Sequence, residues 1–500
     1  MPRDGSNIYS QPFPDVVEDT TIESTVYNGF TNDVAADLNA ARPIVAGGTG
    51  ATNADQALFN LAAEKSTQTV TNYDSHLWVP GSFRSAAAAP GAQNATAAFS
   101  GTCYIQEALA NPPTNQNVTV EARDTTSGTL YIRTKTAGTW SAWTKEHATV
   151  FDALGYNGLQ INGSMDIDQE LGTALRTTAG YVCDGWRVGW GGTMALRANS
   201  GGGAQFVSVG FPNYIYVNPT TAQTTLGSSD YTQVYQRIED ARTARLAWGT
   251  AGAQSISIGF WVCHHRTGTY SGVVRNAAND RAYAFTYTQD VADTAEYKTV
   301  TIPGCTTGVW PTGTNSTSIE VAFSFGCGET LTAPSADTWL NNNYIAGPGQ
   351  VNAVASTADV FRLTGVCVLP GSEAPDASHS ALIMRPYDQE IITCLRYYEK
   401  INGSIGSGSA FATNGFSIAL PYYRKRGTPA ITAVVPTGLR VGNATGTGVA
   451  ITTFDGASPI SNTGAICNFS VASGLVAGNG AALWVPLASA TTFMVMDARL

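Results

Sequence analysis

The sequence predicts a mainly β, multidomain protein in which short N-terminal helices precede β-sandwich or jelly-roll domains. Three observations support this fold class. The chain has 500 residues, enough for about two to four domains of ordinary size. Charged residues make up only 13% of it, against roughly 25% in ordinary soluble proteins, while 10 Trp, 21 Tyr and 18 Phe supply material for cores. Short apolar runs are separated by Gly, Pro and Asn at roughly regular intervals, which is typical of a β-sandwich.

Charge and hydropathy exclude two classes of partner. The formal net charge is −10 and no block of Lys or Arg occurs, whereas a nucleic-acid-binding surface needs clustered cations. No apolar run is long enough for a transmembrane helix, and the N-terminus lacks the apolar core of a signal peptide. We expect no nucleic-acid partner and no membrane insertion. The polar, weakly charged composition suits an extracellular or virion protein.

Residues 1–45 are predicted to form an extended segment followed by one amphipathic helix with Ser24 as its N-cap. Apolar residues recur there every four positions, so they share one helix face. A single short helix has nothing in its own neighbourhood against which to bury such a stripe. We expect it to pack against symmetry mates or a partner protein; the alternative is a helix folded back on the next domain. The stripe consists of Val26, Phe30, Val34 and Leu38.

Residues 46–65 combine a glycine-rich turn with the start of a second short helix. Gly47, Gly48 and Gly50 form the turn, and Thr52 is placed to cap the helix, with Asp55 three residues later. This arrangement resembles an element of many bacteriophage tail-fibre proteins. In those proteins it stands between a tail-attachment segment and the exposed modules. The first ten residues also resemble the start of such proteins.

Residues 66–150 end in a predicted hairpin. Leu130 and Ile132 alternate with polar residues, which is the period of a half-buried strand. Ala137 and Gly138 supply the turn, and Trp140 with Trp143 lie on the returning strand. The segment 128–145 resembles the end of the pyocin-knob module of phage and tailocin fibres.

Residues 151–375 are predicted to form a two-sheet jelly-roll β-sandwich. Its order of short motifs resembles jelly-roll domains of phage tail proteins that are similar to carbohydrate-binding modules. The expected strands are 158–163, 204–210, 255–262, 297–302, 318–325 and 360–369.

Residues 376–400 are predicted to form a linker helix. Pro386 suits its first turn, and Ile391, Leu395 and Tyr398 would share one face. The stretch resembles the link that follows the jelly roll in phage tail proteins. Residues 401–500 are again β-rich and are expected to form a small C-terminal domain at the distal tip.

Motifs of common catalytic sites are absent from the sequence, including those of serine hydrolases, phosphate-binding loops and zinc proteases. His264 and His265 are adjacent on a predicted strand and point to opposite faces, so one is expected to be structural. Asp166, Asp168 and Glu170 alternate and could bind calcium, although a solvated strand edge is the simpler interpretation. We expect no enzyme activity, no cofactor and no metal.

The eight cysteines are scattered and contain no C-x-x-C pair. We expect buried free thiols, with disulfides left open.

Glycan-binding sites commonly combine exposed aromatic faces with neighbouring polar side chains. The candidate glycan-binding residues are Trp140 and Trp143 in the knob-like segment, and Tyr422 and Arg424 at the tip. A cluster at Trp186, Arg187 and Trp190 is a weaker candidate, since each aromatic is more often part of a core.

The resemblances together imply a homotrimeric phage tail fibre or receptor-binding protein of the virion tail. Its N-terminus would attach to a tail or baseplate protein, and its β domains would bind host surface polysaccharide. Two alternatives stay open: a glycan-depolymerising tailspike, and a purely structural tail or collar fibre. The first usually needs a β-helix repeat, which the sequence does not show.

Overall fold

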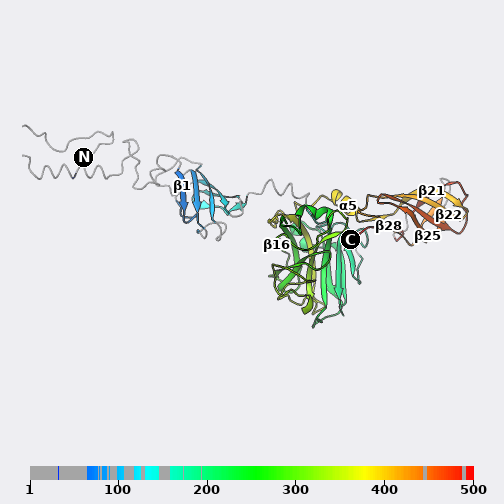
Figure 1. Ribbon diagram of the computed structural model, residues 1–500, viewed down its shortest axis with the longest axis horizontal. Helices are drawn as coiled ribbons and strands as arrows, with labels where there is room; N and C mark the ends of the chain where they lie inside the picture. Colours follow the sequence, from blue (N-terminus) through cyan, green and yellow to red (C-terminus); the bar gives the residue numbers. More distant parts are fainter. Residues whose placement is uncertain are drawn as a thin grey trace, which may run out of the picture. The chain divides into compact units, whose positions relative to one another are not determined.

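The computed structural model describes Asn32, residues 65–145 and residues 158–500, apart from 77, 79–80, 87–88, 90–97, 106–116, 126–129, 173, 193, 443–447 and 487–490. The chain divides into two compact units, Met1–Ala148 and Thr149–Leu500 (Figure 1). The described part is mainly β, as the sequence predicts. Two expected elements lie outside the described residues: the glycine-rich turn, and the helix stripe of Val26, Phe30, Val34 and Leu38.

The N-terminal unit contains a seven-stranded sheet in the order β1-β2-β3-β4-β5-β6, with β7 paired to β5. The β1–β2 pair is parallel and the other pairs are antiparallel. The predicted hairpin is confirmed, because Ala137 and Gly138 form its turn at φ angles of 49° and 84°. The strands are β1 Lys65–Val70, β2 Gly81–Ser85, β3 Phe99–Ile105, β4 Val118–Asp124, β5 Leu130–Thr136, β6 Thr139–Trp140 and β7 Thr144–Lys145.

The second unit begins with two antiparallel sheets that share one core. One sheet has the order β10-β11-β19-β13-β16 and the other β18-β15-β14-β17-β12-β9-β8. Phe260 of the first packs on Phe323 of the second, with ring centroids 4.8 Å apart. The strands are β8 Gly180–Cys183, β9 Trp186–Gly191, β10 Leu196–Gly202, β11 Asn213–Pro219, β12 Tyr231–Glu239, β13 Ile256–His264, β14 Gly268–Asn276, β15 Ala282–Gln289, β16 Glu296–Ile302, β17 Thr317–Cys327, β18 Trp339–Leu340 and β19 Phe361–Pro370.

Two of the six expected strands in this sandwich are wrong. Residues 158–163 form bends and turns, because Asn162 adopts a φ of 50° and its side chain holds the turn through Ile167 and Asp184. Residues 204–209 form a 3-10 helix whose Phe206 is buried in a cluster with Trp261 on the outer face of β13. The other four expected strands correspond to β13, β16, β17 and β19.

A helix and a closed barrel follow the sandwich. Helix α5 runs from Tyr387 to Leu395 and is preceded by Pro386, whereas Tyr398, expected on the helix face, begins β20 instead. Six strands close the barrel in the order β21-β22-β26-β25-β24-β27, and β20, β28 and β23 form a separate small sheet. The strands are β20 Tyr398–Ile401, β21 Ser404–Ala412, β22 Gly415–Pro421, β23 Ala430–Val434, β24 Arg440–Gly442, β25 Val449–Ile460, β26 Gly464–Val471, β27 Gly480–Trp484 and β28 Phe493–Asp497.

Buried ion pairs connect the linker region to the sandwich. Arg396 makes two contacts to the carboxylate of Glu239, of 2.6 and 2.9 Å, and Tyr397 donates its hydroxyl to the same group at 2.8 Å. Arg385 pairs with Glu390 at 3.0 Å, and Glu390 also accepts the backbone N–H of Asn162. These charges lie between the segment after β19 and the strand ends of the sandwich, where their hydrogen bonds offset the cost of burial.

The eight cysteines are all free thiols, and seven of them are buried. Burial raises the pKa of Cys103, Cys367 and Cys467 to about 12, so these thiols stay protonated. Among the described residues, no helix has the length and apolar character that crossing a membrane requires.

Candidate functional site

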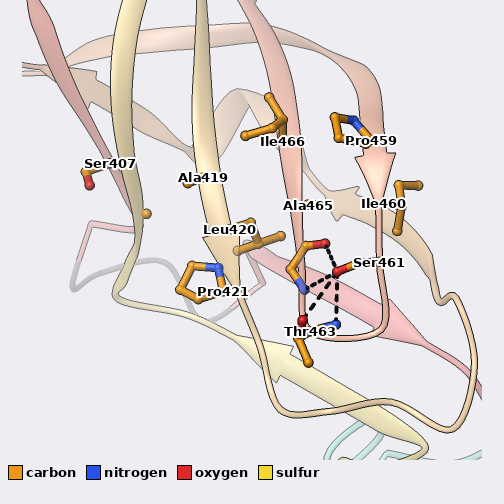
Figure 2. Close-up of a pocket in the computed structure, with 12 residues that line it drawn as sticks. Ser407, Ala419, Leu420, Pro421, Pro459, Ile460, Ser461, Thr463, Ala465 and Ile466 are labelled. Atoms are coloured by element: carbon orange, nitrogen blue, oxygen red, sulfur yellow. Dashed lines mark hydrogen bonds between the residues drawn. The ribbon is translucent and has the colours of Figure 1, made fainter.

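A pocket of about 520 Å³ opens on the C-terminal barrel (Figure 2). Strand β26 lies between β22 and β25 in this wall of the barrel, and β21 lies beyond β22. The floor is a row of cross-strand neighbours in register: Ser407 of β21 faces Ala419 of β22, which faces Ile466 of β26. The pocket is lined by Gly406, Ser407, Ala419, Leu420, Pro421, Pro459, Ile460, Ser461, Thr463, Gly464, Ala465 and Ile466.

The hollow arises from small residues beside an irregular strand. Ser407, Ala419 and Gly464 leave space on the outer face, since adjacent side chains of one face would otherwise fill it. Strand β25 shifts register against β26 between Ala457 and Ile460. A bulge of this kind re-aims the side chains around it. Pro459 and Ile460 thereby form the far wall of the pocket (Figure 2).

The rim of the pocket is a rigid turn. The Ser461 hydroxyl donates to the Gly464 carbonyl at 2.9 Å and accepts the backbone N–H groups of Thr463 and Gly464 at 3.2 and 3.1 Å. The segment after β22 holds this turn from the other side. Tyr422 donates its hydroxyl to the Ser461 carbonyl at 2.8 Å, and the Lys425 N–H donates to Asn462 at 2.7 Å.

Lys425 anchors that segment from within the protein. Its ammonium is completely buried and contacts Glu399 and the Leu395 carbonyl, each at 2.6 Å. Burial lowers the pKa of Lys425, and the hydrogen bond to Glu399 opposes the shift. The pocket wall therefore rests on a buried ion pair rather than on a free loop.

The predicted pair Tyr422 and Arg424 does not form a common platform. Tyr422 is only 8% exposed and belongs to the barrel core, while Arg424 is exposed. Most of the Tyr422 ring is covered by the barrel core, which leaves little of its face open to a sugar. A contact between Tyr422 or Arg424 and glycan stays a prediction. The role of Tyr422 in the structure is to hold the turn at the pocket rim. The exposed aromatic at this place is its neighbour Tyr423, at 53% exposure.

Trp140 and Trp143 come together at the edge of the N-terminal sheet. Both are partly buried against its core, and the Arg133 guanidinium lies 4.6 Å from the ring of Trp140 and 5.6 Å from that of Trp143. Arg133 is in turn paired with Asp74 at 2.7 Å. The arrangement is a cation–π stack with partly exposed rings. Its use in glycan binding stays a prediction.

The cluster at Trp186, Arg187 and Trp190 divides between the two faces of its sheet. Trp186 is buried and donates its ring N–H to the carbonyls of Ile161 and Asn162. Arg187 lies on the opposite face, 5.1 Å from the ring of Tyr181 and 5.5 Å from that of Tyr235. Trp186 is therefore a core residue, and Trp190 is partly buried against the same cluster.

The three alternating carboxylates are already partnered within the protein. Residues 164–170 do not form a strand. Asp166 accepts hydrogen bonds from Ser164 and Asn213, and Asp168 accepts one from Ser200 at 2.6 Å. Glu170 pairs with Arg176 and Arg499. In the described part of the chain, no group of His, Cys, Asp or Glu side chains is arranged to hold a metal.

His264 is a core residue. It is fully buried, stacks on Tyr270 with centroids 3.4 Å apart, and contacts the Tyr287 hydroxyl at 3.2 Å. Burial lowers the pKa of His264 well below its usual range, so the ring is neutral. His265 is exposed on the other face and pairs with Asp293 at 2.7 Å. The expectation of one structural and one outward histidine agrees with this geometry.

No protein-family model matches the sequence, and no curated protein does. Among solved structures, the chain is similar to the enzymatically active domain of tailspike protein 4 of bacteriophage CBA120, with 11% identity and a TM-score of 0.25. That match covers 43% of this chain and 22% of the tailspike chain.

Carbohydrate-binding proteins are also among the similar structures. The family 11 carbohydrate-binding module of a Clostridium thermocellum cellulosomal cellulase matches at 12% identity and a TM-score of 0.20, over 42% of this chain and all of that one. A putative sugar-binding protein from Bacteroides thetaiotaomicron matches at 9% identity and a TM-score of 0.22, over 43% of this chain and 99% of that one.

Proposed function

We propose that this chain is the subunit of a homotrimeric phage tail fibre or receptor-binding protein, located in the virion tail. Its N-terminal segment attaches to a tail or baseplate protein, and its β modules bind host surface polysaccharide without cleaving it. The observation that carries the binding role is the open, uncharged pocket on the C-terminal barrel, whose wall is held by the buried pair of Lys425 and Glu399. A pocket of about 520 Å³ is within the range of small-molecule sites.

The modular order of the chain supports the same role. Separate β modules follow an N-terminal segment whose sequence resembles tail-attachment segments, and the segments 128–145 and 385–400 carry further resemblances to fibre proteins. Three copies of a weak site on one particle raise avidity by about 10²–10⁴ when they engage together. One uncharged pocket of modest affinity on each chain is therefore sufficient for attachment.

Binding and assembly are tested separately. The full chain is applied to immobilised surface polysaccharides from a panel of bacterial strains, and its mass is measured by size-exclusion chromatography with light scattering. We expect binding to a subset of polysaccharides and three times the chain mass. A monomer at every concentration contradicts the trimer. Binding to none of the polysaccharides, by trimer or monomer, contradicts the receptor role and favours a structural fibre.

The absence of cleavage has its own test. The full chain is incubated with each polysaccharide that it binds, and reducing ends are measured over time. We expect no increase above the polysaccharide alone. A steady release of reducing ends would instead identify a depolymerising tailspike.

A further inference from the structure

The lining of the barrel pocket has a chemistry that distinguishes among sugars. We infer that the pocket holds an uncharged sugar unit that carries a methyl group, either a 6-deoxyhexose or an acetylated hexose. This inference rests on the proposed function, because it names the sugar class for a glycan-binding fibre. The apolar residues that line the pocket are Ala419, Leu420, Pro421, Pro459, Ile460, Ala465 and Ile466, of which Leu420 and Ala465 are buried in the barrel core.

Charged sugars are disfavoured by this lining. The pocket's lining residues include no ionisable side chain, and the Ser461 hydroxyl is already used within the turn. A sugar carboxylate brought into the pocket would lose water without gaining a cation or a free donor from Ser461. Burying an ionised group in such surroundings is expensive. Uncharged sugars avoid this cost.

Flat stacking is also disfavoured. Aromatic rings hold a pyranose by covering its apolar face, and the lining has none. Its walls are the aliphatic groups of Pro421, Pro459 and Ile460, above a floor in which Ile466 is 37% exposed. Such walls fit a compact apolar substituent better than an extended ring face. Each methyl-sized group buried there contributes about a four-fold gain in affinity.

The pocket is also shaped by residues that can be changed without disturbing the core. Ala419 is exposed on β22 at the centre of the floor, between Ser407 and Ile466. A longer side chain at this position fills the hollow from outside. Ala450 is likewise an exposed alanine of the barrel, on β25, and does not line the pocket. The pair Ala419→Gln and Ala450→Gln therefore forms a matched test and control.

The experiment is saturation-transfer NMR on the full chain with two pairs of sugars. L-Rhamnose is compared with L-mannose, which differs by an oxygen at carbon 6, and N-acetylglucosamine is compared with glucose. We expect a methyl or acetyl signal at least about four-fold stronger than any signal from the matched sugar without that group. A response to rhamnose identifies the deoxy source, and a response to N-acetylglucosamine identifies the acetyl source.

The variants locate the response. Ala419→Gln is expected to abolish the signal, and Ala450→Gln to leave it unchanged. Equal responses within both sugar pairs overturn the inference, as does a signal that survives in Ala419→Gln. If Ala419→Gln still binds the polysaccharides recognised by the unaltered chain, the pocket assignment fails while the receptor role stands. If the unaltered chain binds no polysaccharide, the receptor role itself fails.

Discussion

Glu239 and Arg396 form a two-point ion pair although they are 157 residues apart in sequence. Glu239 ends strand β12 of the sandwich and is 1% exposed, and Arg396 follows helix α5. Burial acts to raise the pKa of Glu239, and the hydrogen bonds from Arg396 and Tyr397 outweigh it, so the pKa lies below its usual range. This carboxylate therefore stabilises the folded chain as an anion. The pair joins the linker to the sandwich.

Removing the charge of Glu239 is expected to loosen that junction. Breaking a buried ion pair costs about 3–5 kcal/mol, but the Arg396 side chain is 34% exposed and solvent screens it, so we expect about 2 kcal/mol for Glu239→Gln. Hydrogen exchange measured by mass spectrometry should show faster exchange at the end of β12 and in α5.

The control for this variant is Asp290→Asn, which removes a surface partner of Lys298. The Asp290 side chain is 68% exposed, so its ion pair is expected to contribute less than about 0.5 kcal/mol. Unchanged hydrogen exchange at the end of β12 and in α5 of Glu239→Gln would show that the junction does not depend on the ion pair of Glu239 and Arg396.

Asp184 predicts a pH dependence of stability. Burial raises the pKa of Asp184 from 3.8 to about 6, although hydrogen bonds from Gln169 lower it. The folded state therefore holds a proton that the unfolded chain releases above about pH 4. This contribution to stability is complete at low pH and is lost as the pH rises from about 4 to about 6, by about 3 kcal/mol in total.

Asp184→Asn is expected to remove that slope. Urea unfolding is followed by the fluorescence of the buried tryptophans at several pH values between 4 and 7. It gives the free energy of unfolding for the unaltered chain and for Asp184→Asn. As the pH rises, the free energy of unfolding of Asp184→Asn should increase relative to that of the unaltered chain. A constant difference would mean that Asp184 titrates with an ordinary pKa.

Tyr422 is expected to act on the pocket through the turn that it holds. Tyr422→Phe removes one hydrogen bond to the Ser461 carbonyl, which costs about 1 kcal/mol and leaves a backbone acceptor without that partner. We expect weaker sugar binding with no change in the preferred sugar. Tyr423→Phe, at an exposed neighbour, should leave both stability and binding unaltered. Equal effects of the two variants in denaturant unfolding and NMR titration would contradict this role.

Trp140 tests the glycan site predicted for the N-terminal sheet. Aromatic contacts contribute about 0.5–1.5 kcal/mol beyond buried area, so we expect Trp140→Ala to weaken polysaccharide binding several-fold if the N-terminal sheet binds sugar. Trp140→Phe keeps a ring beside Arg133 and should retain most of the binding. Loss of thermal stability without loss of binding in Trp140→Ala would assign the residue to the core alone.

Local patterns predicted the parts of the fold that depend on local chemistry. The hairpin at Ala137 and Gly138 follows from residues that accept a positive φ. Strands β13 and β19 are rich in apolar residues because both of their faces are covered, so their sequences predict strands. Strand β12 was not among the expected strands, since its polar residues alternate with Val234 and Ile238 over a short span.

The errors arise where distant residues decide the conformation. Residues 158–163 look like a strand, but Asn162 turns the chain through hydrogen bonds to Ile167 and Asp184. Local sequence patterns do not predict the pocket, because its floor and wall combine β21, β22 and β26 with a bulge in β25 that only the fold brings together. Its lining is aliphatic, whereas the expected glycan site was based on aromatic residues such as Tyr422. The alternation of Tyr422 with Arg424 does not show which of the two side chains is buried.

The closed order of the C-terminal barrel has a consequence for a protein displayed in several copies. Each of its six strands pairs with a neighbour on both sides. An unpaired strand is a template onto which another chain can add, and crowding several identical chains on one particle raises the chance of such growth. Joining the first strand to the last removes this hazard from the barrel, so in the proposed multi-copy fibre the C-terminal modules would stand close together as separate, unaggregated units.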